Sequence, residues 1–257
     1  MVRVPVVVDV WSAPVDTAVP GGYADVLDAR ERARAAVLPR AAAARFVLGR
    51  LLLRGVLAGH LRCAPHEVVL SVRCPRCGGP HGQVRVVGPR TASAGDTDGA
   101  DDVHVSLTRS GPVVAVALCT TGPVGIDAEA RAAVGAAPLA DVVLAPGELH
   151  RSRGRPRTGT LARRWVRTEA ALKALGTGLT VAPSSVTLEP ATRGSRGVDA
   201  VVAGSVAIAD LRLGRGRAGA VAVLAPHLVR PDAGPGRPGR LLVRRYDGAA
   251  VLTARRS

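Results

Sequence analysis

The sequence predicts an α+β fold made of two similar halves, and three observations support this expectation. Short apolar stretches rich in Val and Ala, such as residues 113–118 and 220–224, are typical of buried strands and occur in both halves. Longer helix-forming stretches precede them at 25–56 and 161–175. In each half, an Arg-aromatic pair in the helical stretch is followed by an Ala-Pro pair, 18 residues on in the first half and 17 in the second.

This spacing indicates an internal repeat. Because a chain rich in Ala and Val resembles itself by chance, coincidence is the alternative explanation. A true duplication would give two pseudo-symmetric halves with a cleft between them that suits a ligand. We expect an N-terminal α+β half at 1–120, a C-terminal α+β half at 121–228, and a weakly ordered basic tail at 229–257, rich in Pro, Gly and Arg. The paired features are Arg45-Phe46 with Arg164-Trp165, and Ala64-Pro65 with Ala182-Pro183.

Local signals predict the individual elements. Alternating and β-branched residues favour strands, Pro39 interrupts a helix, and Gly176 ends one. In chain order, we expect a strand at 4–10, helical structure at 25–56, a strand at 68–73, a polar loop at 89–102, a strand at 113–118, an extended segment at 124–129, a basic loop at 151–159, a helix at 161–175, and strands at 186–188 and 220–224.

The chain is strongly basic, with 35 Lys and Arg against 20 Asp and Glu, and a formal net charge of +15. Such a surface attracts nucleic acid, anionic lipid, phosphorylated small molecules or acidic proteins. Only 2% of the residues are aromatic, which weakens the case for single-stranded nucleic acid, whose bases stack on aromatic rings. The sequence shows neither a signal peptide nor a membrane-spanning stretch. We therefore expect a soluble cytoplasmic protein with its four cysteines reduced.

Lys173 is the only lysine among the 35 basic residues. An ammonium group is compact and can give up its proton, whereas a guanidinium is permanently charged, so the single lysine suggests chemistry. Lys173 follows Glu169 by four residues in a helix-forming stretch, which places both side chains on one helix face. A surface ion pair, or codon bias, is the alternative explanation.

Asp127 and Glu129 form a candidate metal site together with Glu169. Residues two apart on an extended segment point to the same side, and two such carboxylates repel each other unless a cation lies between them. A few oxygen ligands suit Mg²⁺, which keeps several waters and bridges to substrate phosphates. The alternative is a solvated acidic strand end.

A second candidate metal site is incomplete. Cys74, Cys77 and His81 have part of the spacing of a zinc site, and Cys63 or His66 would have to supply the fourth ligand. A glycine-rich turn whose thiols bind no metal is the favoured interpretation.

Taken together, the motifs resemble those of a known enzyme family. The segment Val124-Gly125-Ile126-Asp127-Ala128-Glu129, followed about forty residues later by Trp165-x₃-Glu169-x₃-Lys173, is similar to the two signature motifs of the 4'-phosphopantetheinyl transferases of the surfactin-synthetase-activating type. Residues 176–179, 106–111 and 45–50 also resemble segments of that family. The similarity keeps the family's order across residues 4–225.

The resemblance implies a pseudo-dimeric α+β fold with the active site in the cleft between the halves. It implies holo-[acyl-carrier-protein] synthase activity, in which the 4'-phosphopantetheine arm of coenzyme A (CoA) is transferred to a serine of an acyl or peptidyl carrier protein with Mg²⁺. By position, Asp127, Glu129 and Glu169 would hold the Mg²⁺. Glu169 would also act as general base on the serine.

Basic residues complete the implied site. Lys173 would bind the diphosphate of CoA and protonate the leaving 3',5'-ADP, while Arg45 and Arg109 would contact CoA phosphates. These roles suit the chemistry, because phosphoryl-type transfer depends on positioning and on neutralising charge. The basic surface suits both CoA and a typically acidic carrier protein.

Three positions depart from the family pattern. Thr168 stands where many members have lysine, Arg109 replaces the usual histidine, and Gln83 stands where lysine is common after glycine. A member that binds CoA or a carrier protein without turnover is therefore one alternative, and a basic nucleic-acid-associated protein is another. We expect a monomer, because an internally duplicated chain supplies both halves itself. The identity of the carrier protein, and Mg²⁺ against Mn²⁺, stay open.

Overall fold

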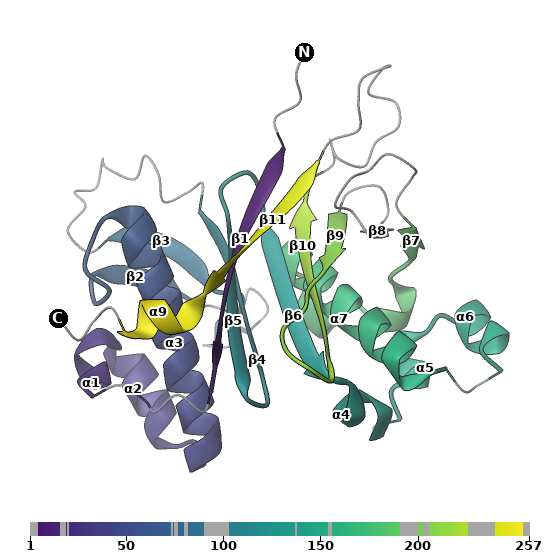
Figure 1. Ribbon diagram of the computed structural model, residues 1–257, viewed down its shortest axis with the longest axis horizontal. Coiled ribbons are helices and arrows are strands. Elements are labelled where there is room, and N and C mark those ends of the chain that lie inside the picture. The colour runs from purple at the N-terminus through teal and green to yellow at the C-terminus, as the bar shows by residue number, and fades with distance from the viewer. Residues whose placement is uncertain are drawn as a thin grey trace. The chain divides into compact units, whose positions relative to one another are not determined.

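The computed structural model describes residues 5–15, 19, 21–72, 74, 77–79, 82–89, 103–136, 138–153, 156–190, 200–202, 206–225 and 240–253, and the fold is mixed α+β (Figure 1). The chain divides into two units. The N-terminal unit comprises residues 9–120 and 245–257, and the C-terminal unit comprises residues 1–8 and 121–244.

The N-terminal unit contains β4, β5 and the larger part of β1 from a sheet with strand order β11-β1-β5-β4, and the division of the chain falls within β1, after Val8, and within β11, after Arg244. β5 is the central partner and pairs antiparallel with both β1 and β4, with Val116 opposite Trp11 on one side and Leu107 on the other. A separate hairpin joins β2 and β3. The strands are β1 (Val6–Pro14), β2 (Val68–Ser71), β3 (Arg85–Pro89), β4 (His104–Ser110), β5 (Val113–Cys119) and β11 (Leu241–Asp247).

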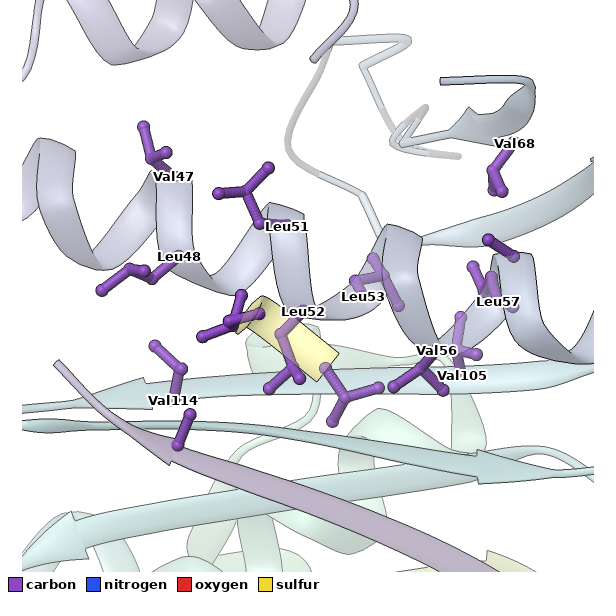
Figure 2. Packing of buried hydrophobic residues seen from close by; sticks show 14 of the residues in the cluster. Val47, Leu48, Leu51, Leu52, Leu53, Val56, Leu57, Val68, Val105 and Val114 are labelled. Carbon is purple, nitrogen blue, oxygen red and sulfur yellow. The ribbon is translucent and has the colours of Figure 1, made fainter. Parts of the chain in front are cut away.

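Helix α3 (Arg40–Leu61) provides more buried residues to the core of this unit than any other element. It begins after Pro39, whose fixed backbone suits the start of a helix. Figure 2 shows its Leu and Val side chains packed with Val105 and Val114 of the sheet, and Leu48, Leu52 and Leu57 are fully buried. The short helices around it are α1 (Tyr23–Val26), α2 (Ala29–Ala36) and α9 (Gly248–Thr253).

The expectation of a weakly ordered tail at 229–257 is wrong for residues 241–253. These residues form β11, which lies beside β1 in the sheet, and then α9. The reason is local: Leu241 is 2% exposed and Leu252 is 1% exposed, so each end of the segment is fixed by a buried side chain. Residues 229–239 and 254–257 lie outside the described ranges.

The C-terminal unit contains a five-stranded sheet with strand order β6-β10-β9-β8-β7. Helix α7 (Thr158–Leu175) packs along β6 and β10 (Figure 1), and its apolar face forms a core with residues of β9 and β10. The other elements are β6 (Val124–Ala130), α4 (Arg131–Ala136), α5 (Ala140–Val143), α6 (Pro146–Arg151), η1 (Gly178–Thr180), η2 (Pro183–Ser185), β7 (Leu188–Pro190), β8 (Ala200–Val202), β9 (Val206–Asp210) and β10 (Arg217–Leu224).

The predicted helix at 161–175 and its end at Gly176 are confirmed, although the helix begins three residues earlier, at Thr158. Gly176 adopts a left-handed conformation with φ of 72°. The backbone N–H of Thr177 donates to the carbonyl of Leu172 at 3.1 Å, which caps the last turn.

A buried arginine joins three elements in the N-terminal unit. Asp28 and Glu31 form a capping box at the start of α2. Arg54 of α3 donates from Nε to Glu31 Oε2 at 2.8 Å and from Nη1 to the carbonyl of Val68 at 2.7 Å. The guanidinium therefore ties α2, α3 and β2 together.

The C-terminal unit contains the same kind of arrangement. Glu148 caps the start of α6 by accepting from the backbone N–H of Ala145 at 2.9 Å. Arg164 of α7 donates to both oxygens of Glu148 at 3.3 Å and to the carbonyl of Val186. This correspondence between the units supports an internal duplication, while the pseudo-dimeric arrangement with a cleft stays a prediction.

Candidate active site

Asp127 and Glu129 lie on the face of the C-terminal sheet that α7 covers. Their partners on β10 are Ala220 and Ala218, which pack with the apolar side of α7. Residues opposite each other in an antiparallel pair share a face, so both carboxylates point to the α7 side. Asp127 is 5% exposed, and Glu129 is half-buried.

Gly125 allows α7 to approach β6 closely. A Cβ added at this position would lie 1.9 Å from the carbonyl oxygen of Ala170, 2.6 Å from the backbone N of Ala174 and 2.9 Å from Cβ of Lys173. Only glycine tolerates so close an approach of two backbones. Gly125 therefore determines the distance between α7 and β6, and with it which side chains of the two elements come into contact.

Lys173 binds Asp127 directly. Its Nζ donates to Oδ1 of Asp127 at 2.7 Å and to the carbonyl of Ile126 at 3.0 Å. The Asp127 side chain is 8% exposed and that of Lys173 is 29% exposed. A buried carboxylate needs such a partner, because an unpaired charge in the interior is costly.

Glu169 lies one helical turn before Lys173 and beside the same carboxylates. Its Oε1 is buried and has no hydrogen-bond partner among the described residues. Burial raises the pKa of Glu169; the ammonium of Lys173 opposes this, and the charges of Asp127 and Glu129 raise the pKa further. Electrostatic interactions therefore connect the four predicted residues, Asp127, Glu129, Glu169 and Lys173. Because burial and two neighbouring acids disfavour the charged form of Glu169, its carboxylate would be stabilised by a proton or a cation.

These carboxylates fit a hard divalent cation in chemistry. Asp127 and Glu129 share a face, and no residue of the described ranges donates to the buried Oε1 of Glu169. Within the described ranges, however, no three His, Cys, Asp or Glu side chains already stand in an arrangement that could hold a metal ion. In this arrangement, the ammonium of Lys173 supplies the positive charge beside Asp127.

Arg109 and Arg45 belong to the N-terminal unit. The guanidinium of Arg109 on β4 lies over the ring of Phe46, with Cζ 5.3 Å from the ring centroid. Burial, together with the charges of Arg50, Arg34 and Arg45, lowers the pKa of Arg109 to about 10. Both predicted CoA-contacting arginines are therefore part of one basic cluster.

The structure explains one departure from the family pattern. Thr168 is fully buried, donates to the carbonyl of Arg164 at 2.9 Å and accepts from the guanidinium of the same residue. That guanidinium also binds Glu148. Thr168 thus helps to hold the buried Arg164 side chain, one turn earlier in α7, in place.

Cys74, Cys77, Gly78 and Gly79 are the described residues of the CxxC region, which lies between β2 and β3 in the chain. The backbone N–H of Cys74 donates to the carbonyl of Gly79 at 2.8 Å, and the N–H of Gly79 donates to Sγ of Cys77 at 3.4 Å. Gly78 adopts a φ of 70°, as expected for a glycine-rich turn. His81, the third residue of the incomplete zinc pattern, lies outside the described residues.

Sequence reasoning placed Arg50 and Arg164 in motifs but did not predict that their side chains are buried. Both are arginines on long helices and are only 8% exposed. A sequence signal for such burial is an arginine at a position that helical periodicity assigns to the apolar face of a helix. Arg50 is at such a position, because Val47, Leu51 and Leu53 are its apolar neighbours on the helix. Such a residue must meet a buried acid or a ligand.

A comparison with protein families finds one match. Residues 123–214 match the family model of the 4'-phosphopantetheinyl transferase superfamily. The matched range contains Asp127, Glu129, Glu169 and Lys173, and it supports transfer of phosphopantetheine from CoA as the general activity. No curated protein sequence matches the chain. Among the described helices, none is both long and apolar enough to cross a bilayer.

Proposed function

We propose that this chain transfers the 4'-phosphopantetheine arm of CoA to a serine of an acyl or peptidyl carrier protein, with Mg²⁺, as a transferase of the surfactin-synthetase-activating type. One observation carries the proposal: Lys173 of α7 binds Asp127 of β6, and Glu169 of α7 interacts electrostatically with both, inside the range that matches the superfamily.

Asp127, Glu129 and Glu169 would hold the Mg²⁺. When bound, the ion supplies positive charge for the diphosphate of CoA. Lys173 donates to Asp127 Oδ1 and to the carbonyl of Ile126, and its flexible stem allows it to turn to a diphosphate oxygen instead.

Glu169 would act as the general base. The oxygen of the carrier serine attacks the phosphorus next to the pantetheine arm, its proton passes to Glu169, and the bond from that phosphorus to 3',5'-ADP breaks. A general base works best when its pKa lies near the working pH, and the raised pKa of Glu169 moves it in that direction. Lys173 would neutralise or protonate the departing phosphate oxygen.

The test is mass spectrometry of several carrier proteins incubated with the chain, CoA and Mg²⁺. A carrier that is modified gains the mass of one phosphopantetheine arm. Asp127→Ala and Glu169→Ala should abolish the gain in mass. Asp210→Ala should retain it, because this control removes an acid of β9 that pairs with Arg167, a residue of the same helix as Glu169. Absence of a mass gain on every carrier would refute the enzymatic proposal.

The two alternatives predict different results. A basic nucleic-acid-associated protein would bind nucleic acid with an affinity that falls steeply with salt and survives Glu169→Ala. A member without turnover would bind CoA or a carrier protein and leave the carrier's mass unchanged. The two-unit chain is proposed to act as a monomer in the cytoplasm.

A further inference from the structure

A row of apolar side chains crosses the sheet β11-β1-β5-β4 and ends at its surface. Val116 of β5 lies opposite Leu107 of β4 on one side and opposite Trp11 of β1 on the other. The ring of Trp11 stacks on that of Tyr246 of β11, with centroids 4.9 Å apart and an interplanar angle of 19°. Burial decreases along the row, because Val116 is fully buried, Trp11 is half-buried and Tyr246 is 40% exposed.

The row ends because the sheet ends. β11 is the outermost strand, so one of its edges has no neighbouring strand among the described residues. Residues 244–247, the second half of β11, are all exposed. The backbone N–H and C=O groups of such an edge can pair with another extended chain. A residue of that chain opposite Tyr246 would continue the row by a cross-strand contact.

The residue types at this edge are those that dominate binding energy in protein interfaces. Trp, Tyr and Arg are the most enriched among such side chains, and Arg244 and Arg245 directly precede Tyr246 in β11. The whole chain has only 2 Trp, 2 Tyr and 1 Phe. Two of these few aromatic rings are therefore stacked at a sheet edge, where they add less to the core than buried rings would.

Charge decides which kind of chain the edge would accept. Arg244 and Arg245 are consecutive in a strand, so they point to opposite faces and make both faces basic. A second copy of the chain paired edge to edge would bring the same arginines against them, and like charges across strands are destabilising. The acid of this stretch, Asp247, accepts from the backbone N–H of Ala249 at 2.8 Å at the start of α9. An acidic segment is therefore the favoured occupant.

We propose that the edge of β11 from Arg244 to Asp247 is a docking site for an extended acidic segment of another protein, which adds to the sheet as one more strand. Its backbone would pair with that of β11, its acidic side chains would meet Arg244 and Arg245, and an apolar side chain would contact Tyr246. This site does not rest on the proposed function, and none of the measurements below involves CoA or a carrier protein.

The test uses the full chain and three synthetic hexapeptides with blocked ends. Glu-Val repeated three times joins acidic charge to a strand-forming pattern, Lys-Val reverses the charge, and Glu-Pro keeps the charge but removes the N–H groups of every second residue. Trp165→Phe leaves Trp11 as the single tryptophan, whose fluorescence reports binding. We expect Glu-Val to bind with an affinity that falls as salt rises, and the other two peptides to bind about fivefold more weakly or less.

Variants of exposed residues locate the site. Tyr246→Ala should weaken Glu-Val binding about fivefold or more. Arg245→Glu should make the chain prefer Lys-Val to Glu-Val, and because Arg245 is exposed this variant should fold even if Tyr246→Ala does not. Arg85→Glu is the matched control, since Arg85 is an exposed arginine on β3 of the separate hairpin, and it should keep the preference for Glu-Val.

Four outcomes would overturn the proposal. Absence of Glu-Val binding would remove the site, and equal binding of Glu-Pro would reduce it to attraction by charge without strand pairing. An equal effect of Arg85→Glu and Arg245→Glu would assign binding to the net charge of the whole chain. A wild-type dimer in sedimentation that the Glu-Val peptide dissociates would assign the edge to a second copy of the chain.

Discussion

The ammonium nitrogen of Lys173 lies 2.7 Å from Oδ1 of Asp127, although 46 positions separate the two residues in the chain. This contact joins the only lysine of the protein to the buried acid of β6. It also joins α7 to β6 by a side-chain contact, in addition to the close approach of the two backbones at Gly125.

Asp127 and Lys173 should be energetically coupled. In buffer with a chelator, a double-mutant cycle of Asp127→Asn and Lys173→Met, measured by urea unfolding, should give a coupling of about 1–2 kcal/mol. This is less than for a fully buried pair, because Lys173 is 29% exposed. The exposed pair Arg163–Asp210, 3.4 Å apart, should give below about 0.5 kcal/mol. Equal coupling in the two pairs would contradict the prediction.

Gly125→Ala should force α7 away from β6. The added methyl would lie 1.9 Å from the carbonyl of Ala170, and neither backbone can yield without displacing the helix. We expect a loss of about 3 kcal/mol or more in the free energy of unfolding. Gly159→Ala, in the first turn of the same helix, has open space around its Cβ and should add about 0.5–1 kcal/mol. Similar stability of the two variants would disprove the close-packing role of Gly125.

The juxtaposition of acids and lysine could be anticipated because each pair follows a local period. Glu169 and Lys173 are four apart on a helix, and Asp127 and Glu129 are two apart on a strand. The sequence could not show that Lys173 contacts Asp127, because that contact depends on how closely the backbone of α7 approaches Gly125. The roles of these residues with Mg²⁺ and CoA stay predictions.

The ordered segment at the C-terminal end and the buried arginine of α3 were not predicted, because the overall composition of the chain conceals both. The segment after residue 240 follows a stretch rich in Pro, Gly and Arg, and averaging over that region conceals the two buried leucines, Leu241 and Leu252. The burial of Arg50 was missed for a related reason, since the chain contains 34 arginines. Only the fold reveals which of them are withdrawn from water.

Replacing Thr168 by the lysine common in the family should not improve the protein. Thr168 is fully buried and hydrogen-bonded to Arg164, so a second cation there would be unpaired beside a guanidinium. We expect Thr168→Lys to lose about 3 kcal/mol or more of unfolding free energy, whereas Thr168→Val, which keeps the shape, should lose about 1–2 kcal/mol. Chemical denaturation measures both. A Thr168→Lys variant as stable as the wild type would show that the side chain can leave the core.

Lys173→Arg should cost more rate than CoA affinity. The charge remains, but the planar fork cannot reproduce a compact ammonium and does not release its proton. We expect the turnover rate to fall about tenfold or more, while the Kd for CoA changes by less than about threefold. Carrier-modification kinetics and calorimetry give the two values. Equal turnover in the variant would assign the single lysine to codon usage.

Glu169→Gln should stabilise the metal-free protein at neutral pH and not in acid. The folded pKa of Glu169 lies above its usual 4.5, mainly because the carboxyl is buried. Its contribution to stability is therefore fully present below the unfolded pKa and is lost as the pH rises through the raised folded value. Gln carries no charge at any pH, so the melting temperature of the variant should exceed that of the wild type increasingly as the pH rises above the unfolded pKa and through the folded one.

Glu148→Gln provides a control of opposite sign. Burial acts to raise the pKa of Glu148, but hydrogen bonds from the backbone of Ala145 and from Arg164, with the charge of Arg164, outweigh it and lower the pKa. Its stabilising contribution is present above the unfolded pKa and is lost as the pH falls through the folded value. The Gln variant should therefore melt below the wild type at neutral pH, with a difference that shrinks in acid. If the two variants changed stability in the same direction with pH, Glu169 would not be a buried acid held among other acids, and its suitability as a base would lose its physical support.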